Sequence, residues 1–152
     1  MPQSLSAIYV HAIFHVKGTS VEIHDKHFEG LQAYTYALLC NNGCDAIQIG
    51  CVRDHMHLLF RLSPSVALAQ LIGKVKFATN QYLKSLDGAY RIGFEWQAGY
   101  AAYSVGYKQL PLAKAYVTDQ RNHHKDKSFT DEYLQFLRGN NVDFNEEFVF
   151  KD

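Results

Sequence analysis

His55 and His57, two histidines with one residue between them, are the side chains whose type and spacing most directly indicate chemistry in this chain. They lie in the segment DHMHLLFRL, where apolar and other residues alternate as they do in a β-strand. Side chains two positions apart on a strand point to the same face, so the two imidazoles would lie side by side and share one divalent cation. Two solvent-facing strand histidines would have the same spacing, so the pattern alone leaves both interpretations open.

All eight histidines of the chain fall into close pairs. The pairs are His11 and His15, His24 and His27, His55 and His57, and His123 and His124. Paired imidazoles are typical of metal sites. Because the first and third strands of the expected sheet are neighbours, we expect His11 or His15 to lie beside the central pair, and we take His123 and His124 as further candidates.

Tyr116 is the second candidate, in the segment PLAKAYVTDQRNHHKDK. The spacing predicts a helix from Pro111 to about residue 125, and its apolar stripe is weak after Ala115, so a core helix explains it poorly. Tyr116 and Gln120 are four residues apart and share a helical face, as a tyrosine and an amide ligand delivered to a metal-bound phosphate would. A surface tyrosine covering its neighbours has the same spacing, and the chain has ten tyrosines, so composition does not choose among them.

The elements that must position these residues follow from the periodicity of the chain. Strands are predicted at 7–17, with one buried face, and at 45–52, 55–62 and 100–106; helices are predicted at 26–40, 66–86, 111–125 and 128–139. Residues 87–99 are expected to be a connection, and the phenylalanine-rich tail to dock on the body. This order predicts an α+β, ferredoxin-like or RRM-like sandwich: an antiparallel sheet with helices on one face, plus C-terminal helices, one of which carries the candidate Tyr116. We expect a single domain over residues 1–152.

Composition excludes several classes of protein. The chain has 152 residues, 47% of them apolar, and balances 15 basic against 15 acidic side chains, unlike a protein that simply coats phosphates. Cys40, Cys44 and Cys51 show no CxxC spacing, which argues against a disulfide framework or a zinc knuckle. No apolar run approaches the roughly 20 residues that span a bilayer, and the N-terminus lacks a signal-peptide pattern. We therefore expect a soluble, cytoplasmic protein.

Four longer stretches resemble one known family. They are IGCVRDHMHLLFRL, FEWQAGYAAYSVG, AYVTDQRNHHKDKSFTDEY and NNVDFNEEFVF. In order and spacing they resemble the HUH single-tyrosine transposases of small bacterial insertion sequences, with the REP-associated tyrosine transposases as relatives. The resemblance implies that His55 and His57 are metal ligands, that Tyr116 in a Tyr-x-x-x-Gln pattern is the nucleophile, and that Gln120 completes the metal shell. The segment GTSVEIHD departs from the family by being less basic.

The resemblance also implies a reaction and partners. Tyr116 would attack a phosphodiester of single-stranded DNA beside bound Mg²⁺ or Mn²⁺, leaving a 5′-phosphotyrosine that a 3′-hydroxyl can later attack. A homodimer is implied, in which the tyrosine helix of one subunit serves the histidine pair of the other, as is recognition of DNA hairpins. The residues expected to contact DNA are Arg53, Arg61, Lys74 and Lys76, with Tyr100, Tyr103 and Tyr107 stacking on bases.

Three other functions fit parts of the pattern. A catalytically idle DNA-hairpin-binding module would keep the fold without cleavage. An RRM-like RNA-binding protein would share the sheet, although the first strand lacks the expected aromatic pattern. A metal-dependent hydrolase would use water as the nucleophile and would not need Tyr116.

Overall fold

Four strands form one antiparallel sheet in the order β2-β3-β1-β4, as the sequence predicts for a ferredoxin-like fold. The computed structural model describes residues 2–119, 128–145, 147 and 149–150. The strands are β1 (Tyr9–His15), β2 (Asp45–Cys51), β3 (His55–Arg61) and β4 (Ala101–Val105). The helices are η1 (Asp25–His27), α1 (Phe28–Asn41), α2 (Leu68–Leu86), α3 (Gly88–Gly93), η2 (Tyr107–Gln109), α4 (Leu110–Thr118) and α6 (Phe129–Gly139).

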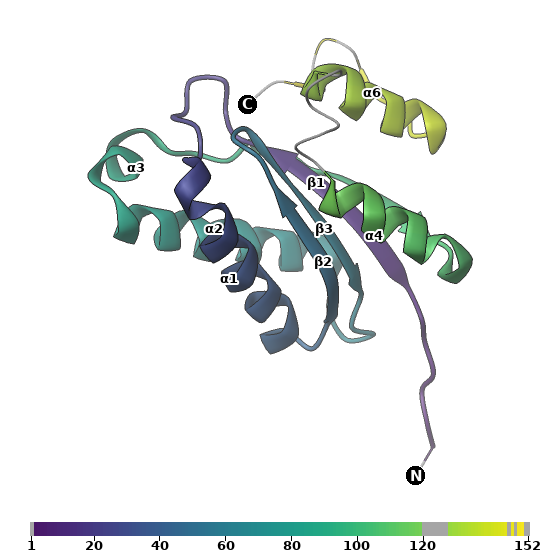
Figure 1. The fold of residues 1–152 in the computed structure, drawn as a ribbon. Helices are drawn as coiled ribbons and strands as arrows, with labels where there is room; N and C mark the ends of the chain where they lie inside the picture. The colour runs from purple at the N-terminus through teal and green to yellow at the C-terminus, as the bar shows by residue number, and fades with distance from the viewer. Residues whose placement is uncertain (1, 120–127, 146, 148, 151–152) are drawn as a thin grey trace.

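One face of the sheet packs against α1 and α2 (Figure 1). Helical spacing selects the residues that these helices bury. They are Phe28, Leu31, Thr35 and Leu39 in α1, and Leu71, Ile72, Val75, Thr79 and Leu83 in α2. From β3, Met56, Leu58 and Phe60 enter the same core.

The opposite face of the sheet is covered by α4 and α6, which Figure 1 shows on the far side of the strands from α1 and α2. A second, smaller core lies there, made of Ile13, Ala101, Tyr103, Tyr133 and Leu137. The prediction of a first strand with one buried face is therefore wrong, because β1 is buried on both faces. Alternation shows which residues share a face, but a distant helix decides whether that face meets water.

Two helices differ from the sequence prediction. The segment expected to be a connection contains α3, which begins where the Asp87 side chain accepts a hydrogen bond from the Ala89 backbone N–H at 2.9 Å. Its six residues are too few for an apolar period to be visible. Helix α4 ends at Thr118, and Asp119, with φ −97° and ψ 31°, departs from the predicted helix. Positions 120–125 of that prediction lie outside the described residues.

Two helix ends follow from their residue types, and the predicted docking of the tail is confirmed for its described phenylalanines. The Ser128 hydroxyl caps α6 by accepting a hydrogen bond from the Asp131 N–H. Gly43 follows α1 at φ +79°, a conformation that glycine adopts without strain. Phe144 and Phe150 of the tail pack against the second core; Phe148 lies outside the described residues. None of the helices in the described part of the chain has the length and apolar character to cross a membrane.

Candidate active site

His55 and His57 lie side by side on the face of the sheet that α4 and α6 cover, with ring centroids 5.1 Å apart. The alternation of β3 sends Met56 and Leu58 into the core beneath α1 and α2, and the two histidines to the other face. Both imidazoles are 0% exposed. The alternative interpretation as solvent-facing strand histidines is therefore wrong.

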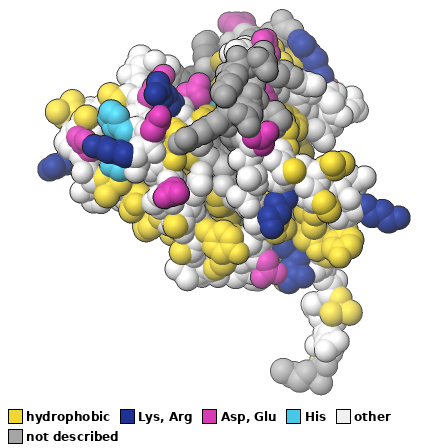
Figure 2. Space-filling view, in the orientation of Figure 1, with side chains coloured by type: hydrophobic (Ala, Val, Ile, Leu, Met, Phe, Trp, Pro, Cys, Tyr) yellow, Lys and Arg dark blue, Asp and Glu magenta, His cyan; other side chains and the backbone are white. Residues whose placement is uncertain are grey.

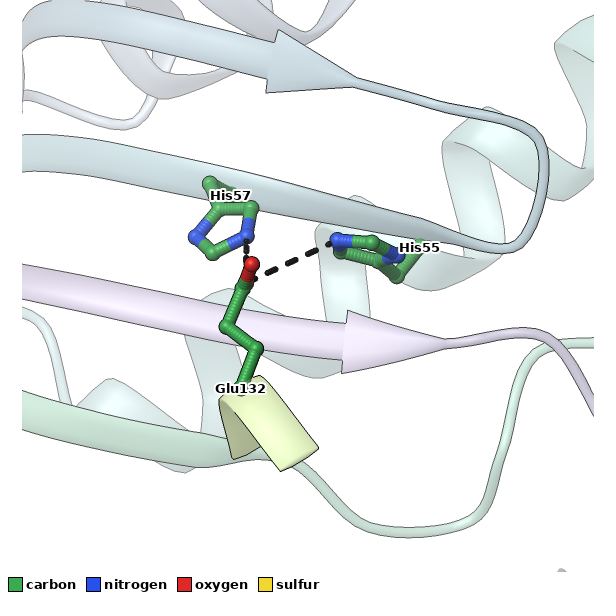
Figure 3. Close-up of side chains that lie close together, drawn as sticks. All are labelled: His55, His57 and Glu132. Atoms are coloured by element: carbon green, nitrogen blue, oxygen red, sulfur yellow. Dashed lines mark ion pairs between the residues drawn. The ribbon is translucent and has the colours of Figure 1, made fainter. Parts of the chain in front are cut away.

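A third side chain, Glu132 of α6, reaches the same two imidazoles (Figure 3). Its Oε1 lies 2.8 Å from His57 Nε2 and 3.8 Å from His55 Nε2. Glu132 is 1% exposed, which is rare for a carboxylate. In the part of the chain that is described, these three residues are the group whose imidazole and carboxylate atoms are arranged as metal ligands, all within 4.8 Å of one another.

Sequence reasoning missed Glu132, although α6 carries a signal for it. The side of the helix that faces the sheet is a stripe at helical spacing, formed by Phe129, Glu132, Tyr133, Phe136 and Leu137. A carboxylate inside an otherwise apolar stripe must have a buried partner, because burying an isolated charge costs several kcal/mol. That mismatch between residue type and position would have identified Glu132.

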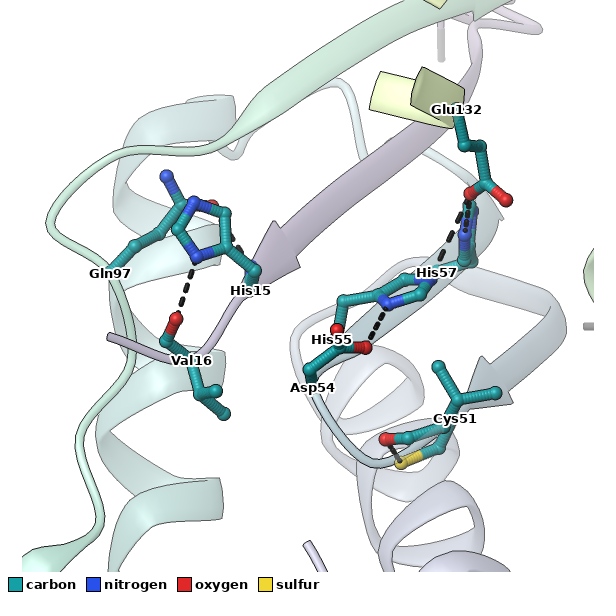
Figure 4. A network of polar contacts seen from close by, with 9 residues as sticks. His15, Val16, Cys51, Asp54, His55, His57, Gln97 and Glu132 are labelled. Carbon is teal, nitrogen blue, oxygen red and sulfur yellow. Dashed lines mark hydrogen bonds and ion pairs between the residues drawn. The ribbon is translucent and has the colours of Figure 1, made fainter. Parts of the chain in front are cut away.

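Further contacts orient both imidazoles. His55 Nδ1 donates to Asp54 Oδ1 at 2.7 Å (Figure 4), and His57 Nδ1 hydrogen bonds with His11 Nε2 at 2.7 Å. Since Nδ1 of each ring is engaged, Nε2 is the atom that faces Glu132. Burial, followed by the nearby His57, lowers the pKa of His11 to about 3, so this ring is neutral at physiological pH. Such carboxylate and imidazole partners fix the tautomer of metal-binding histidines.

Of the two first-strand histidines, His11 is the one that hydrogen bonds with the pair. His15 stands opposite His55 in the strand register and is 7% exposed. Its Nδ1 lies 2.7 Å from the Val16 carbonyl oxygen, and its backbone N–H donates to Gln97 Oε1 at 2.9 Å. Figure 4 shows this ring directed toward Val16 and Gln97.

Tyr116 projects from α4 toward the same histidines. Its half-buried ring has its centroid 5.9 Å from that of His57 and 6.4 Å from that of His11. The next residue, Val117, is 0% exposed and anchors this helix on the sheet. Gln120, His123 and His124 lie outside the described residues.

Aromatic rings of α6 enclose the cluster. Phe129 stacks on His55 with ring centroids 4.3 Å apart, and Phe136 lies 5.2 Å from both His11 and Tyr116. These rings exclude water from the imidazoles. Electrostatic interactions among the buried polar groups are stronger for that reason.

The donor set fits a divalent cation. Two imidazole nitrogens and one carboxylate oxygen suit Mn²⁺, Fe²⁺ or Zn²⁺, whereas Mg²⁺ prefers oxygen ligands alone. Neighbouring ligands on an octahedral ion at about 2.1 Å are about 3 Å apart, and opposite ones about 4.2 Å. The observed separations of 2.8 and 3.8 Å are close to that range.

The two arginines expected to contact DNA form ion pairs. Arg53 Nε donates to Asp25 Oδ1 at 3.0 Å, and Arg61 pairs with Asp45. Both pairs are exposed to solvent and contribute little to stability. DNA phosphates would therefore have to compete with these carboxylates for the guanidinium groups.

The two lysines expected to contact DNA lie on α2, on the sheet face opposite the histidines. Lys74 is exposed, while Lys76 Nζ donates to the carbonyl oxygens of Gln97 and Gly99, at 2.9 Å for Gln97. Burial lowers the pKa of Lys76 to about 8. On the face shown in Figure 2, basic side chains are scattered and mixed with acidic ones.

The three tyrosines expected to stack on bases differ in exposure. Tyr103 is 5% exposed and stacks on Phe136, so its ring is already covered. Tyr100 packs against the first core. Tyr107 is 75% exposed and presents its ring to solvent.

Comparison with known proteins identifies the family. A family model described as transposase IS200-like matches residues 4–120, which include the four strands and α4 but not α6. A solved structure of a candidate transposase from Deinococcus radiodurans is similar, with a TM-score of 0.61, 18% identity, and coverage of 79% of this chain and 95% of that chain. A REP-associated tyrosine transposase bound to a REP hairpin has a TM-score of 0.59 and 10% identity, with 82% of this chain and 72% of that chain covered. No curated protein matches significantly. At these identities the two structures share the fold, and the sequence match assigns membership: the chain belongs to the IS200-like transposase family.

Proposed function

We propose that this transposase cleaves and rejoins single-stranded DNA with Tyr116 as nucleophile, beside a divalent cation held by His55 and His57. One observation carries the proposal: the Tyr116 ring lies 5.9 Å from the ring of His57, on the same covered face of the sheet. Tyrosine and histidines come from separate elements, α4 and β3. That convergence is what a tyrosine nucleophile beside a metal-bound phosphate requires.

The covalent step transfers one phosphoryl linkage. The Tyr116 oxygen attacks the phosphorus and gives up its proton, while the bond from phosphorus to the 3′-oxygen breaks and that oxygen takes up a proton. The product is a 5′-phosphotyrosine with a free 3′-hydroxyl. Another 3′-hydroxyl reverses the step and restores Tyr116, so rejoining needs no external energy source. A bound Mg²⁺ or Mn²⁺ would supply charge neutralisation at the phosphate oxygens.

The surrounding residues prepare the two imidazoles. Asp54 accepts the Nδ1 proton of His55 and leaves Nε2 as a metal-binding lone pair. Neutral His11 can accept a hydrogen bond from His57 Nδ1–H in the same way. We retain Gln120 as a further ligand, and His123 and His124 as further site residues, on the family pattern alone.

The proposed partner is DNA with hairpin ends, recognised by one domain over residues 1–152 acting as a homodimer. The REP-associated relative bound to a REP hairpin supports the choice of DNA. Exposed Lys74, and Arg53 and Arg61 once released from their carboxylate partners, are the proposed phosphate contacts. Lys76 is less suited to this role, because two carbonyl oxygens of its own chain already accept from it.

Adduct formation tests the proposal. The full chain is incubated with Mn²⁺ and an end-labelled hairpin oligonucleotide with single-stranded flanks, then analysed on a denaturing gel. We expect a covalent protein–DNA band that chelator abolishes and Tyr116→Phe lacks. Tyr36→Phe is the matched control, since it removes the hydroxyl of an exposed tyrosine of α1, on the other side of the sheet from the site.

The other outcomes identify the alternatives. Cleavage that survives Tyr116→Phe indicates a hydrolase with a water nucleophile. Hairpin binding without cleavage by the unaltered chain indicates an idle DNA-binding module. The RRM-like alternative is disfavoured, because α4 and α6 cover the sheet face that such a protein would present to RNA.

A further inference from the structure

Glu132 is a charged residue in an unusual position. It is 1% exposed, projects from the apolar side of α6, and lies outside the residues that match the family. A carboxylate is almost never buried to this extent unless a cation or several hydrogen-bond donors face it. The role of Glu132 therefore depends on which groups face its carboxylate.

Among the described residues, the Nε2 atoms of His57 and His55 face Glu132 Oε1, at 2.8 and 3.8 Å. Asp54 is acceptor-only when ionised, so the hydrogen bond at His55 Nδ1 places the proton on that nitrogen. In the tautomer with its proton on Nδ1, His55 has its Nε2 lone pair available to a cation bound by the carboxylate. A divalent cation between the two groups would bind to both, and it would also compensate the buried negative charge.

The geometry converges on one point (Figure 3). The three ligand atoms lie within 4.8 Å of one another, although they come from one strand and from a helix far along the chain. Each imidazole is oriented by a partner on its other nitrogen. Two imidazoles and one carboxylate also leave open positions on a six-coordinate ion for a phosphate oxygen and water.

We propose that Glu132 is a ligand of the divalent cation held by His55 and His57, so that α6 is part of the metal centre of this chain. This inference rests on the metal site of the proposed function. The competing arrangement is an ion pair between Glu132 and protonated His57, with no metal bound by the carboxylate. The two arrangements predict opposite consequences of neutralising Glu132 for metal affinity.

Metal binding without DNA tests the inference. The full chain is stripped with chelator, and MnCl₂ is titrated while free Mn²⁺ is measured by electron paramagnetic resonance. We compare the unaltered chain with Glu132→Gln, His55→Ala and the matched control Asp131→Asn, which removes the same charge from the exposed adjacent position of α6. Circular dichroism and the unfolding midpoint of each metal-free variant check folding, and Glu132→Asp is a second, charge-preserving variant.

We expect one tight Mn²⁺ site per chain, weakened at least about tenfold in Glu132→Gln, since even indirect partners of metal ligands contribute 10- to 100-fold. Asp131→Asn should bind within about twofold of the unaltered chain. Glu132→Asp should bind more tightly than Glu132→Gln.

Equal or tighter binding by folded Glu132→Gln, with binding lost in His55→Ala, overturns the inference and leaves the proposed histidine metal site intact. Absence of a tight Mn²⁺ site in the unaltered chain instead overturns both the inference about Glu132 and the proposed histidine metal site. Should Glu132→Gln not fold, Glu132→Asp decides: weaker binding than in the unaltered chain supports a ligand that has been drawn back by one methylene, and unchanged binding overturns the inference.

Discussion

Replacing Asp54 should weaken metal binding without removing a metal ligand. Its carboxylate accepts the Nδ1 proton of His55 at 2.7 Å and so selects the tautomer with Nε2 available to the cation. A hydrogen bond to a charged group contributes about 1.5–3 kcal/mol. Because the Asp54 side chain is 47% exposed, water competes, and we expect about 1–2 kcal/mol. That corresponds to about a 5- to 30-fold loss of Mn²⁺ affinity in Asp54→Ala.

The assay is the Mn²⁺ titration of the full chain described above. Asp54→Asn retains a neutral acceptor oxygen, so its loss should be smaller, less than about fivefold. Asp25→Ala is the matched control, since it removes an exposed carboxylate whose partner is Arg53. The reasoning is refuted by Asp54→Ala binding Mn²⁺ within twofold of the unaltered chain while His55→Ala does not bind it.

Three further predictions concern the body that supports the site. Thr79→Val should lower the free energy of unfolding, measured in urea, by about 1–3 kcal/mol, because buried Trp96 Nε1 donates to the Thr79 hydroxyl at 3.0 Å. Thr79→Ser keeps this hydroxyl, so a loss in Thr79→Val no greater than that in Thr79→Ser would contradict the prediction. Leu71→Ala, at 0% exposure, should lose about 2–5 kcal/mol, and Leu86→Ala, at 42%, less than about 1; equal losses would be inconsistent with the packing. Burial lowers the pKa of Lys76 to about 8 in the folded protein, whereas the ordinary pKa of lysine, 10.5, applies in the unfolded chain. Between these two pH values the unfolded state therefore binds more protons. The unfolding free energy should therefore rise from pH 8 to 10 relative to Lys76→Met, and a pH-independent difference would argue against this.

The family pattern and the site geometry cover different parts of the chain. The matched residues 4–120 contain His55, His57 and Tyr116, whereas Glu132 lies in α6 beyond them. A pattern shared by a family is blind to a ligand that an individual chain supplies from outside it. Only the packing of α6 on the sheet shows that the candidate centre has a carboxylate as well as imidazoles.

Local periodicity was enough to predict most elements and the faces that they present. The two-residue period of β3 places both histidines on one face, and the helical spacing of α2 selects Leu71 and Val75 for burial. Periodicity failed for α3, whose six residues are too few to show a helical period. It also failed for the end of α4, where no glycine or proline follows Thr118 to mark the stop.

The sequence by itself determined that His55 and His57 are neighbours on a strand and that a helix follows Ser128, because those features depend on residues a few positions apart. The tertiary structure alone decided that the histidine face is buried, that His11 rather than His15 bonds to the pair, and that Glu132 joins it. Each of these depends on contacts between segments far apart in the chain. Their geometry is fixed when sheet and helices pack, and no local period encodes it.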